Sequence, residues 1–293
     1  MKCSRLWLGV LSLLWIPVTL AEVVLPVNDW QSIRYITDSP KFSRAISQNT
    51  NDDNIVAIHN LLFARMVINP VIEVLPMAKI TEVLSAQAPA CTFFKLKTPA
   101  RQSRFIFSLP TDFLLTHHLY TLKHNAPLVS AVLNNNGEVS SLAELFRQNP
   151  DKHIILLKDR SYGAELDNQI AALPDSAVYW RWGTNQYNDD VKMLVRERAA
   201  FVLTFPASVD HLTAPTGEGN SELVGYRIAG SPLFKSGHIM CNDTPQTQAF
   251  ISAADNSLRS LYYEPAYRSA LLKGKSRQRA ATLDQVLGII QQY

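Results

Sequence analysis

Apolar and polar positions along the chain follow two alternating periods. A period of two, or a short apolar run, predicts strands at 32–36, 72–75, 91–96, 105–107, 153–157, 178–182, 200–205 and 238–241. A period near 3.6 predicts helices at 55–67, 79–87, from 141 onward, and at 164–172, 189–197, 244–256 and 282–292. Strands that alternate with helices indicate an α/β architecture. The sequence contains no internal repeat and no flexible linker. Because the chain is long, two lobes are favoured over one continuous sandwich.

The first 21 residues have the pattern of a secretory signal. Lys2 and Arg5 precede the apolar stretch Leu6–Ala21, which ends in the small-residue pattern Thr19-Leu20-Ala21. At 16 residues the stretch is short for a membrane span, which needs about 20. We therefore predict cleavage before Glu22 and an exported mature protein. The alternative is an N-terminal anchor that is not cleaved.

Export changes the interpretation of the three cysteines. Cys3 is removed with the signal, which leaves Cys91 and Cys241. An even pair in an oxidising compartment predicts a disulfide, which would close a loop of roughly 150 residues. The alternative is two buried thiols.

Charge and composition exclude several classes of function. The whole chain has a formal net charge of +3, and without Lys2 and Arg5 the remaining 26 basic and 25 acidic residues leave +1. This body lacks the charge excess typical of a nucleic-acid-binding protein. Only 11 residues are glycine, and neither GxGxxG nor GxxxxGK[ST] occurs, so a phosphate-binding loop is not predicted. We expect no cofactor and no nucleic-acid partner.

Motifs for catalysis or metal binding are also missing from the sequence. It contains no GxSxG, HExxH, CxxC or SxxK, and its histidines lack the spacing of metal ligands. His117 and His118 are adjacent, so they would face opposite ways on a strand, as surface or crossover residues. Asp189 and Asp190 are expected to cap the start of a helix rather than to act as catalytic acids. We therefore predict that the protein is not an enzyme; a dehydratase-like activity would need a pocket Asp or Glu as general acid.

Five segments, in order along nearly the whole mature chain, resemble the polar amino-acid type of periplasmic solute-binding protein, family 3. Residues 98–110 (TPARQSRFIFSLP) resemble its T-x-x-R-x(5)-F-S-x-P segment. The other four are 33–42 (IRYITDSPKF), 141–145 (SLAEL), 161–163 (SYG) and 193–202 (MLVRERAAFV). His238–Cys241 falls where such a chain returns to its first lobe. The similarity is greatest to a divergent, poorly characterised exported subgroup.

The resemblance implies a type II periplasmic-binding-protein-like fold, in which two α/β lobes are joined by two crossover strands. Mapped onto this chain, the signal is 1–21, lobe one is 22–114 with 231–293, and lobe two is 115–230. Cys91 and Cys241 then both fall in lobe one, where a bond would fasten that lobe without restraining the hinge. The resemblance also implies a periplasmic, monomeric protein that delivers a small polar or anionic solute to an inner-membrane permease of an ABC transporter. The alternative partner is a membrane receptor, for which the protein would be a ligand-sensing module.

The resemblance and the residue chemistry together give the candidate ligand-binding residues, which are Arg101, Ser161, Asp38, Phe42, Thr98, Arg160 and Tyr162. Arg101 presents a planar fork that can bind a carboxylate through two hydrogen bonds. Ser161 or Arg160 lies beside a helix N-terminus, whose backbone donors and dipole favour an anion. Asp38 would add a polar contact and Phe42 an apolar or stacking wall. The structural alternatives are a surface ion pair for Arg101, a helix cap for Ser161, a core position for Phe42 and a turn for Asp38.

Two departures from the family pattern bear on the ligand. Relatives that bind amino acids place an Asp after the strand that follows the M-L helix, where it binds the ligand ammonium, whereas this strand ends Thr204-Phe205-Pro206. The segment 86–91 likewise lacks the family's G-x-x-D. Recognition of an α-amino group by lobe two is therefore not expected. A carboxylate-bearing ligand without that ammonium is favoured; the alternatives are a peptide-like or aromatic compound, or no ligand at all.

Overall fold

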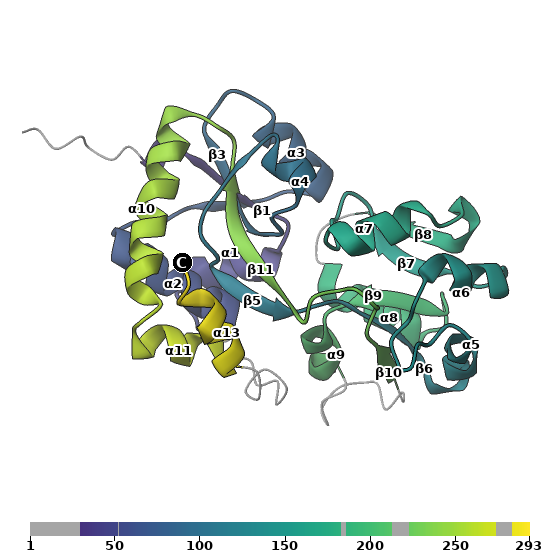
Figure 1. Ribbon diagram of the computed structural model, residues 1–293. Coiled ribbons are helices and arrows are strands. Elements are labelled where there is room, and N and C mark those ends of the chain that lie inside the picture. Colours follow the sequence, from purple (N-terminus) through teal and green to yellow (C-terminus); the bar gives the residue numbers. More distant parts are fainter. Residues whose placement is uncertain (1–29, 52, 183–185, 213–222, 274–282) are drawn as a thin grey trace, which may run out of the picture.

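The computed structural model describes residues 30–51, 53–182, 186–212, 223–273 and 283–293. The predicted signal at 1–21 lies outside these residues. The described chain forms two sheets, each covered by helices, in two lobes that lie side by side (Figure 1). The first and last parts of the described chain belong to one lobe, and the middle part forms the other (Figure 1).

The first sheet has the strand order β2-β1-β3-β11-β4, and β5 also pairs with β11. β1 is parallel to β2 and β3, whereas β11 is antiparallel to β3, β4 and β5. The strands are β1 (Arg34–Thr37), β2 (Ile72–Val74), β3 (Ala90–Lys95), β4 (Ile106–Phe107), β5 (Asp112–Leu115) and β11 (Phe234–Cys241).

Helices cover both faces of this sheet because successive side chains of a strand point to opposite faces. On β1, Tyr35 packs into the larger cluster with α2 and α10, whereas Ile36 packs with Ile80 of α3 on the other face. The helices of this lobe are α1 (Pro40–Ser47), α2 (Asn54–Met66), α3 (Met77–Leu84), α4 (Pro99–Gln102), α10 (Pro245–Leu261), α11 (Pro265–Leu271) and α13 (Leu283–Ile290), with a 3-10 turn at Trp30–Ser32.

The second sheet has the strand order β10-β6-β9-β7-β8. β7 is parallel to β8 and β9, and β6 is antiparallel to β9 and β10. Its elements are β6 (His118–Leu122), α5 (Ala126–Ser130), α6 (Leu142–Gln148), β7 (Ile154–Leu157), α7 (Ala164–Ala171), β8 (Val178–Arg181), α8 (Gln186–Val195), β9 (Phe201–Thr204), α9 (Pro206–Leu212) and β10 (Leu223–Tyr226), with 3-10 turns at Lys123–Asn125 and Asp175–Ala177. α6 and α7 contribute to the cluster on one face, and α8 and α9 to the cluster on the other.

Two antiparallel strands connect the lobes. β5 leads directly toward β6, and β11 follows β10 back into the first sheet, with Phe234 opposite Leu115 and Gly237 opposite Asp112. Both strands run between the lobes in Figure 1. This α/β topology with two crossover strands confirms the fold class predicted from the sequence.

Cys91 and Cys241 are bonded. They lie opposite each other in the antiparallel β3–β11 pair, and both are fully buried. The predicted disulfide is therefore confirmed, and it joins two strands of the first sheet.

Side chains cap the starts of several helices, but the cap predicted at Asp190 is not found. Ser141 accepts a hydrogen bond from Glu144 N at the start of α6, and Thr244 forms a capping box with Thr247 at the start of α10. The prediction that Asp190 caps a helix is wrong, because α8 begins at Gln186 and Asp190 lies in its second turn. There the buried Asp190 pairs with Arg181 at 2.5 Å, since a buried carboxylate needs a partner. Within the described residues, no helix is long and apolar enough to cross a membrane.

Candidate functional site

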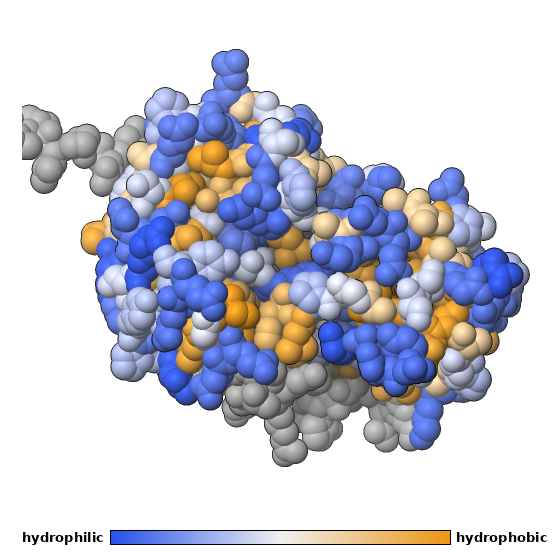
Figure 2. Space-filling view, viewed as in Figure 1, coloured by the Kyte–Doolittle hydropathy of each residue, from blue (hydrophilic) through white to orange (hydrophobic). Residues whose placement is uncertain are grey.

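The candidate site lies where the carboxyl ends of parallel strands from both lobes face each other. Asp38 directly follows β1, Lys95 ends β3, and Arg160 lies in the turn after β7. In open α/β sheets, ligands bind at the carboxyl ends of the strands. In the space-filling view, the lobes meet along a waist at which both hydrophilic and hydrophobic residues reach the surface (Figure 2).

A buried ion pair forms the floor of the site in the first lobe. Lys95 Nζ lies 2.8 Å from Asp38 Oδ1 and 3.7 Å from Met77 Sδ. The side chains of Lys95 and Asp38 are only 5% and 1% exposed. Burial alone would raise the pKa of Asp38, but the hydrogen bond and charge of Lys95, together with the charge of Arg160, hold it below its usual value. Burial lowers the pKa of Lys95, and the charge of Asp38 opposes that shift.

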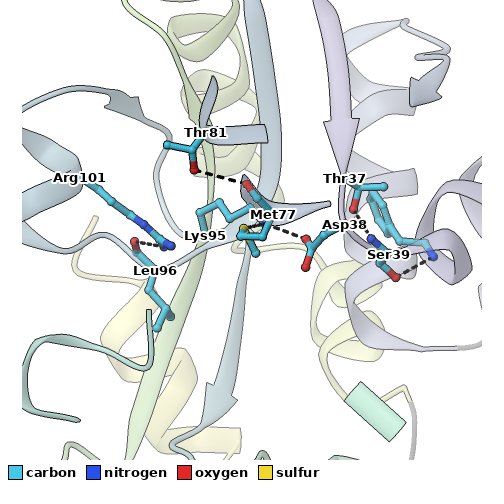
Figure 3. A network of polar contacts seen from close by, with 9 residues as sticks. Thr37, Asp38, Ser39, Met77, Thr81, Lys95, Leu96 and Arg101 are labelled. Atoms are coloured by element: carbon cyan, nitrogen blue, oxygen red, sulfur yellow. Dashed lines mark hydrogen bonds and ion pairs between the residues drawn. The ribbon is translucent and has the colours of Figure 1, made fainter. Parts of the chain in front are cut away.

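Arg101 lies beside this pair on the short helix α4. Figure 3 shows Lys95 between Arg101 and Asp38. The half-buried guanidinium of Arg101 donates from Nη1 to the Leu96 carbonyl at 3.2 Å, and its charge lowers the pKa of Lys95. Thr98 is buried at the N-cap of α4, where its carbonyl accepts a hydrogen bond from Arg101 N. The hydrogen bond within the 98–101 segment therefore holds the backbone of Arg101 in place.

Arg160 brings a second guanidinium from the other lobe. Asp159 adopts the left-handed backbone conformation at φ +64°, and Arg160 N closes the turn by donating to Leu157 O. The guanidinium carbon lies 5.9 Å from the Tyr162 ring centroid. Arg160 is close enough to the first lobe that its charge lowers the pKa values of both Asp38 and Lys95. The structure thus brings together Asp38, Arg101 and Arg160, three of the residues singled out from the sequence.

Ser161 has its hydroxyl engaged within its own lobe. Ser161 Oγ donates to Asp167 Oδ2 at 2.5 Å, and Tyr162 N donates to Asp167 Oδ1 at 2.6 Å. Asp167 belongs to the first turn of α7, so a carboxylate of the chain itself occupies these donors next to the helix N-terminus.

Tyr162 and Phe42 lie in the cores of their lobes. Tyr162 is 1% exposed, and its hydroxyl accepts a hydrogen bond from Leu157 N. Phe42 is 3% exposed and contacts Phe94 edge-on, with ring centroids 4.4 Å apart, within an aromatic cluster that includes His59. Phe42, on α1, supports the backbone near Asp38, and Tyr162, just before α7, supports the backbone near Arg160.

Sequence reasoning did not identify Lys95 or Lys235, and it placed His117 at the surface or in the crossover, of which only the crossover is correct. Lys95 could have been found as the one charged residue within the apolar strand predicted at 91–96. Lys235, on the crossover strand β11, donates to the Tyr162 carbonyl in the second lobe. His117, between the crossover strand β5 and β6, lies with its ring 3.9 Å from that of Phe205. It is fully buried, and burial together with the charges of Arg160, Lys235 and His118 lowers its pKa well below the usual value.

No group of three or more His, Cys, Asp or Glu side chains that could hold a metal ion occurs in the described part of the chain. What the site offers is cationic hydrogen-bond donors from both lobes around one buried carboxylate, a chemistry suited to binding an anion.

Comparison of the structure with solved proteins identifies its fold. An ABC uptake transporter substrate-binding protein from Streptococcus pneumoniae with bound histidine aligns with a TM-score of 0.59 at 10% identity, covering 83% of this chain and 92% of that one. An amino acid ABC transporter substrate-binding protein from the same species, bound to L-arginine, gives 0.55 at 13% identity, with 84% and 95% covered. A Salmonella typhimurium periplasmic binding protein described for high arginine specificity gives 0.54 at 13%, with 81% and 96% covered. The chain therefore has the two-lobed periplasmic-binding-protein fold. No family model matches its sequence, and no curated protein matches it.

Proposed function

We propose that this protein is an exported solute-binding protein that captures a small, carboxylate-bearing solute between its lobes and delivers it to a membrane transporter. The observation that carries the proposal is the convergence of Arg101 from one lobe and Arg160 from the other on the Asp38–Lys95 pair. An anion that contacts both guanidiniums binds more tightly when the lobes are closed, so it shifts the population toward the closed form. The solved proteins with this fold are substrate-binding proteins of transporters, which supports the same role here.

Within this proposal, the seven predicted residues divide into two groups. Arg101, Arg160 and Asp38 contact the ligand. Thr98, Ser161, Tyr162 and Phe42 hold the segments that carry those three. The lobe boundaries remain those predicted from the sequence, at 114/115 and 230/231, and the protein acts as a periplasmic monomer without enzymatic activity. The alternative role, a ligand sensor for a membrane receptor, uses the same site; neighbouring permease and ATPase genes would favour transport.

The test is a thermal-shift screen of the mature protein against amino acids, organic acids and amines, followed by calorimetry on each compound that raises the melting temperature. We expect Arg101→Ala to weaken binding of a carboxylate at least tenfold, since a charge-assisted pair is lost. Arg104→Ala is the matched control: Arg104 lies three residues away, where its guanidinium donates to Ser85 Oγ and covers the Phe105 ring. A protein that responds to no compound, and whose Arg101 variant behaves as the Arg104 variant does, would refute the proposal.

A further inference from the structure

One buried oxygen at the site has no hydrogen-bond partner. Asp38 Oδ1 accepts from Lys95, but Asp38 Oδ2 is buried and accepts from no group in the described residues. A buried carboxylate oxygen without a donor is costly to keep in that state. The side chain is 1% exposed, and it stands at the end of β1 where the two lobes meet. A donor supplied by the bound solute would satisfy Oδ2.

The surrounding charges decide which kind of donor fits. Lys95 already neutralises Asp38, and the guanidiniums of Arg101 and Arg160 lie close enough to add positive charge around Lys95. An ammonium group placed against Asp38 Oδ2 would therefore enter a region with an excess of positive charge. A hydroxyl group can donate the same hydrogen bond without this repulsion.

Two acids of the second lobe already have partners within that lobe. Asp167 accepts from Ser161 Oγ and Tyr162 N, and Asp190 pairs with Arg181. Asp38 is the acid that lies against Lys95, with the charge of Arg160 close enough to act on it. Neither Asp167 nor Asp190 is therefore available to pair with a ligand ammonium without losing its own partner.

We propose that the site selects a hydroxycarboxylate: its carboxylate is bound by Arg101 and Arg160, and its hydroxyl donates to Asp38 Oδ2. Lys95 is the residue that sets the selectivity, because it cancels the charge that would otherwise attract an ammonium. The inference rests on the proposed function and narrows its ligand class.

Solutes with the same carbon skeleton test this selectivity. Calorimetry would compare malate, succinate and aspartate, and in a shorter series lactate, propionate and alanine. We expect the hydroxy acid to bind about tenfold more tightly than the unsubstituted acid, because it adds a hydrogen bond to a charged group. The amino acid should bind most weakly. An amino acid that binds as tightly as the hydroxy acid overturns the inference, and so does a wild-type protein that binds other solutes but neither hydroxy acid.

Two variants isolate the residues. Lys95→Met keeps the length of the side chain and removes its charge, so the affinity ratio of aspartate to malate should rise at least tenfold. Asp38→Asn should bring the affinities of malate and succinate within about threefold of each other. Lys97→Met, at an exposed lysine two residues along the chain, is the control and should change neither ratio. Variants that keep the wild-type ratios while folded contradict the inference; if either variant fails to fold, the wild-type ranking decides.

The failure of this inference can be told apart from failure of the proposed function. If no compound in the broad screen shifts the melting temperature of the wild-type protein, the binding function itself is refuted. If amino acids bind and hydroxy acids do not, the binding function stands and the selectivity is wrong.

Discussion

The ammonium of Lys235 donates a hydrogen bond to the carbonyl of Tyr162, and so joins a crossover strand to the turn that carries Arg160. Lys235 pairs with Leu114 in the β5–β11 ladder and is 8% exposed. The next residue after Tyr162 is Gly163, at φ +99°, directly before α7. The crossover and the second-lobe half of the site are therefore one connected structure.

This connection predicts that Gly163→Ala is more harmful than an ordinary glycine substitution. A Cβ at Gly163 would overlap Nζ and Cε of Lys235, so the buried ammonium would have to move, in addition to the strain of a positive φ. We expect a loss of about 2–3 kcal/mol in the free energy of unfolding, measured by urea denaturation. Ligand affinity should also fall, because Lys235 must move away from Tyr162.

Gly137→Ala is the matched control. Gly137 also has a positive φ, +72°, but an added Cβ would meet nothing within 4 Å. It should therefore cost only the backbone strain, about 1 kcal/mol. Equal losses at the two positions would show that the contact with Lys235 is unimportant.

The disulfide should support stability without affecting ligand binding. Cys91 and Cys241 are 150 residues apart in sequence, and loop-closure models give about 4–5 kcal/mol for so long a loop. Both lie in the first sheet, and Cys241 is at the opposite end of β11 from residues 234–237, which pair with β5 in the crossover. Opening and closing of the lobes should therefore not depend on the bond. The double variant Cys91→Ala, Cys241→Ala should melt well below the wild type and bind its ligand within about twofold of it. A large loss of affinity in the folded double variant would contradict this.

The pattern of the sequence predicted eight strands in their order along the chain because buried strands and amphipathic helices have strong, distinct periods, but it missed β6 and β10 of the second sheet. It extended less well to short elements: α1 begins at Pro40 after the Ser39 cap, and β5 covers Asp112–Leu115, but neither was predicted. α1 is half polar and β5 has only four residues, so the structure of both depends on packing against distant residues. β11 begins at Phe234, four residues before the predicted start, because its first residues pair with β5 in the crossover.

Which residue types form the candidate site could be predicted from the sequence, but which side chains contact each other could not. Arg101 could be identified because it stands in the T-x-x-R segment and Arg160 because it lies beside a helix N-terminus, and a guanidinium suits anion binding at both places. The pairing of Asp38 with Lys95, and of Ser161 with Asp167, depends on which side chains lie together in space. Ser161 illustrates the difficulty, since its position beside a helix N-terminus suits equally a ligand contact and a bond to a carboxylate of the same helix.

Stability should fall in mild acid, in part because of His59. This histidine is fully buried among aromatic rings, with Nδ1 2.8 Å from Ile55 O, and burial lowers its pKa to about 4. Above pH 6.5 it is neutral in both the folded and unfolded states. As the pH falls from 6.5 toward 4, the unfolded state takes up a proton that the folded state does not, so unfolding becomes easier by about 1.4 kcal/mol per pH unit.

The check is urea denaturation at several pH values between 4.5 and 7.5, for the wild type and for His59→Leu. The variant cannot take up the proton at this position. Its free energy of unfolding should therefore change less steeply with pH, by about 1.4 kcal/mol per pH unit. Burial also lowers the pKa of His238 to about 4, so part of the slope should remain. Identical slopes in the two proteins would show that His59 does not contribute.

Ser161 and Asp167 should act on the fold of the turn more than on the ligand. Ser161→Ala removes one hydrogen bond to Asp167 Oδ2, at a cost of about 1 kcal/mol in the free energy of unfolding. Asp167→Ala also leaves Tyr162 N without its partner and removes a carboxylate from the first turn of α7, so about 2–3 kcal/mol is expected. Calorimetry should show a smaller loss of ligand affinity for Ser161→Ala than for Arg101→Ala. If Ser161→Ala instead abolished binding at unchanged stability, its hydroxyl would have to contact the ligand directly, and Asp167 would have to release it when the ligand binds.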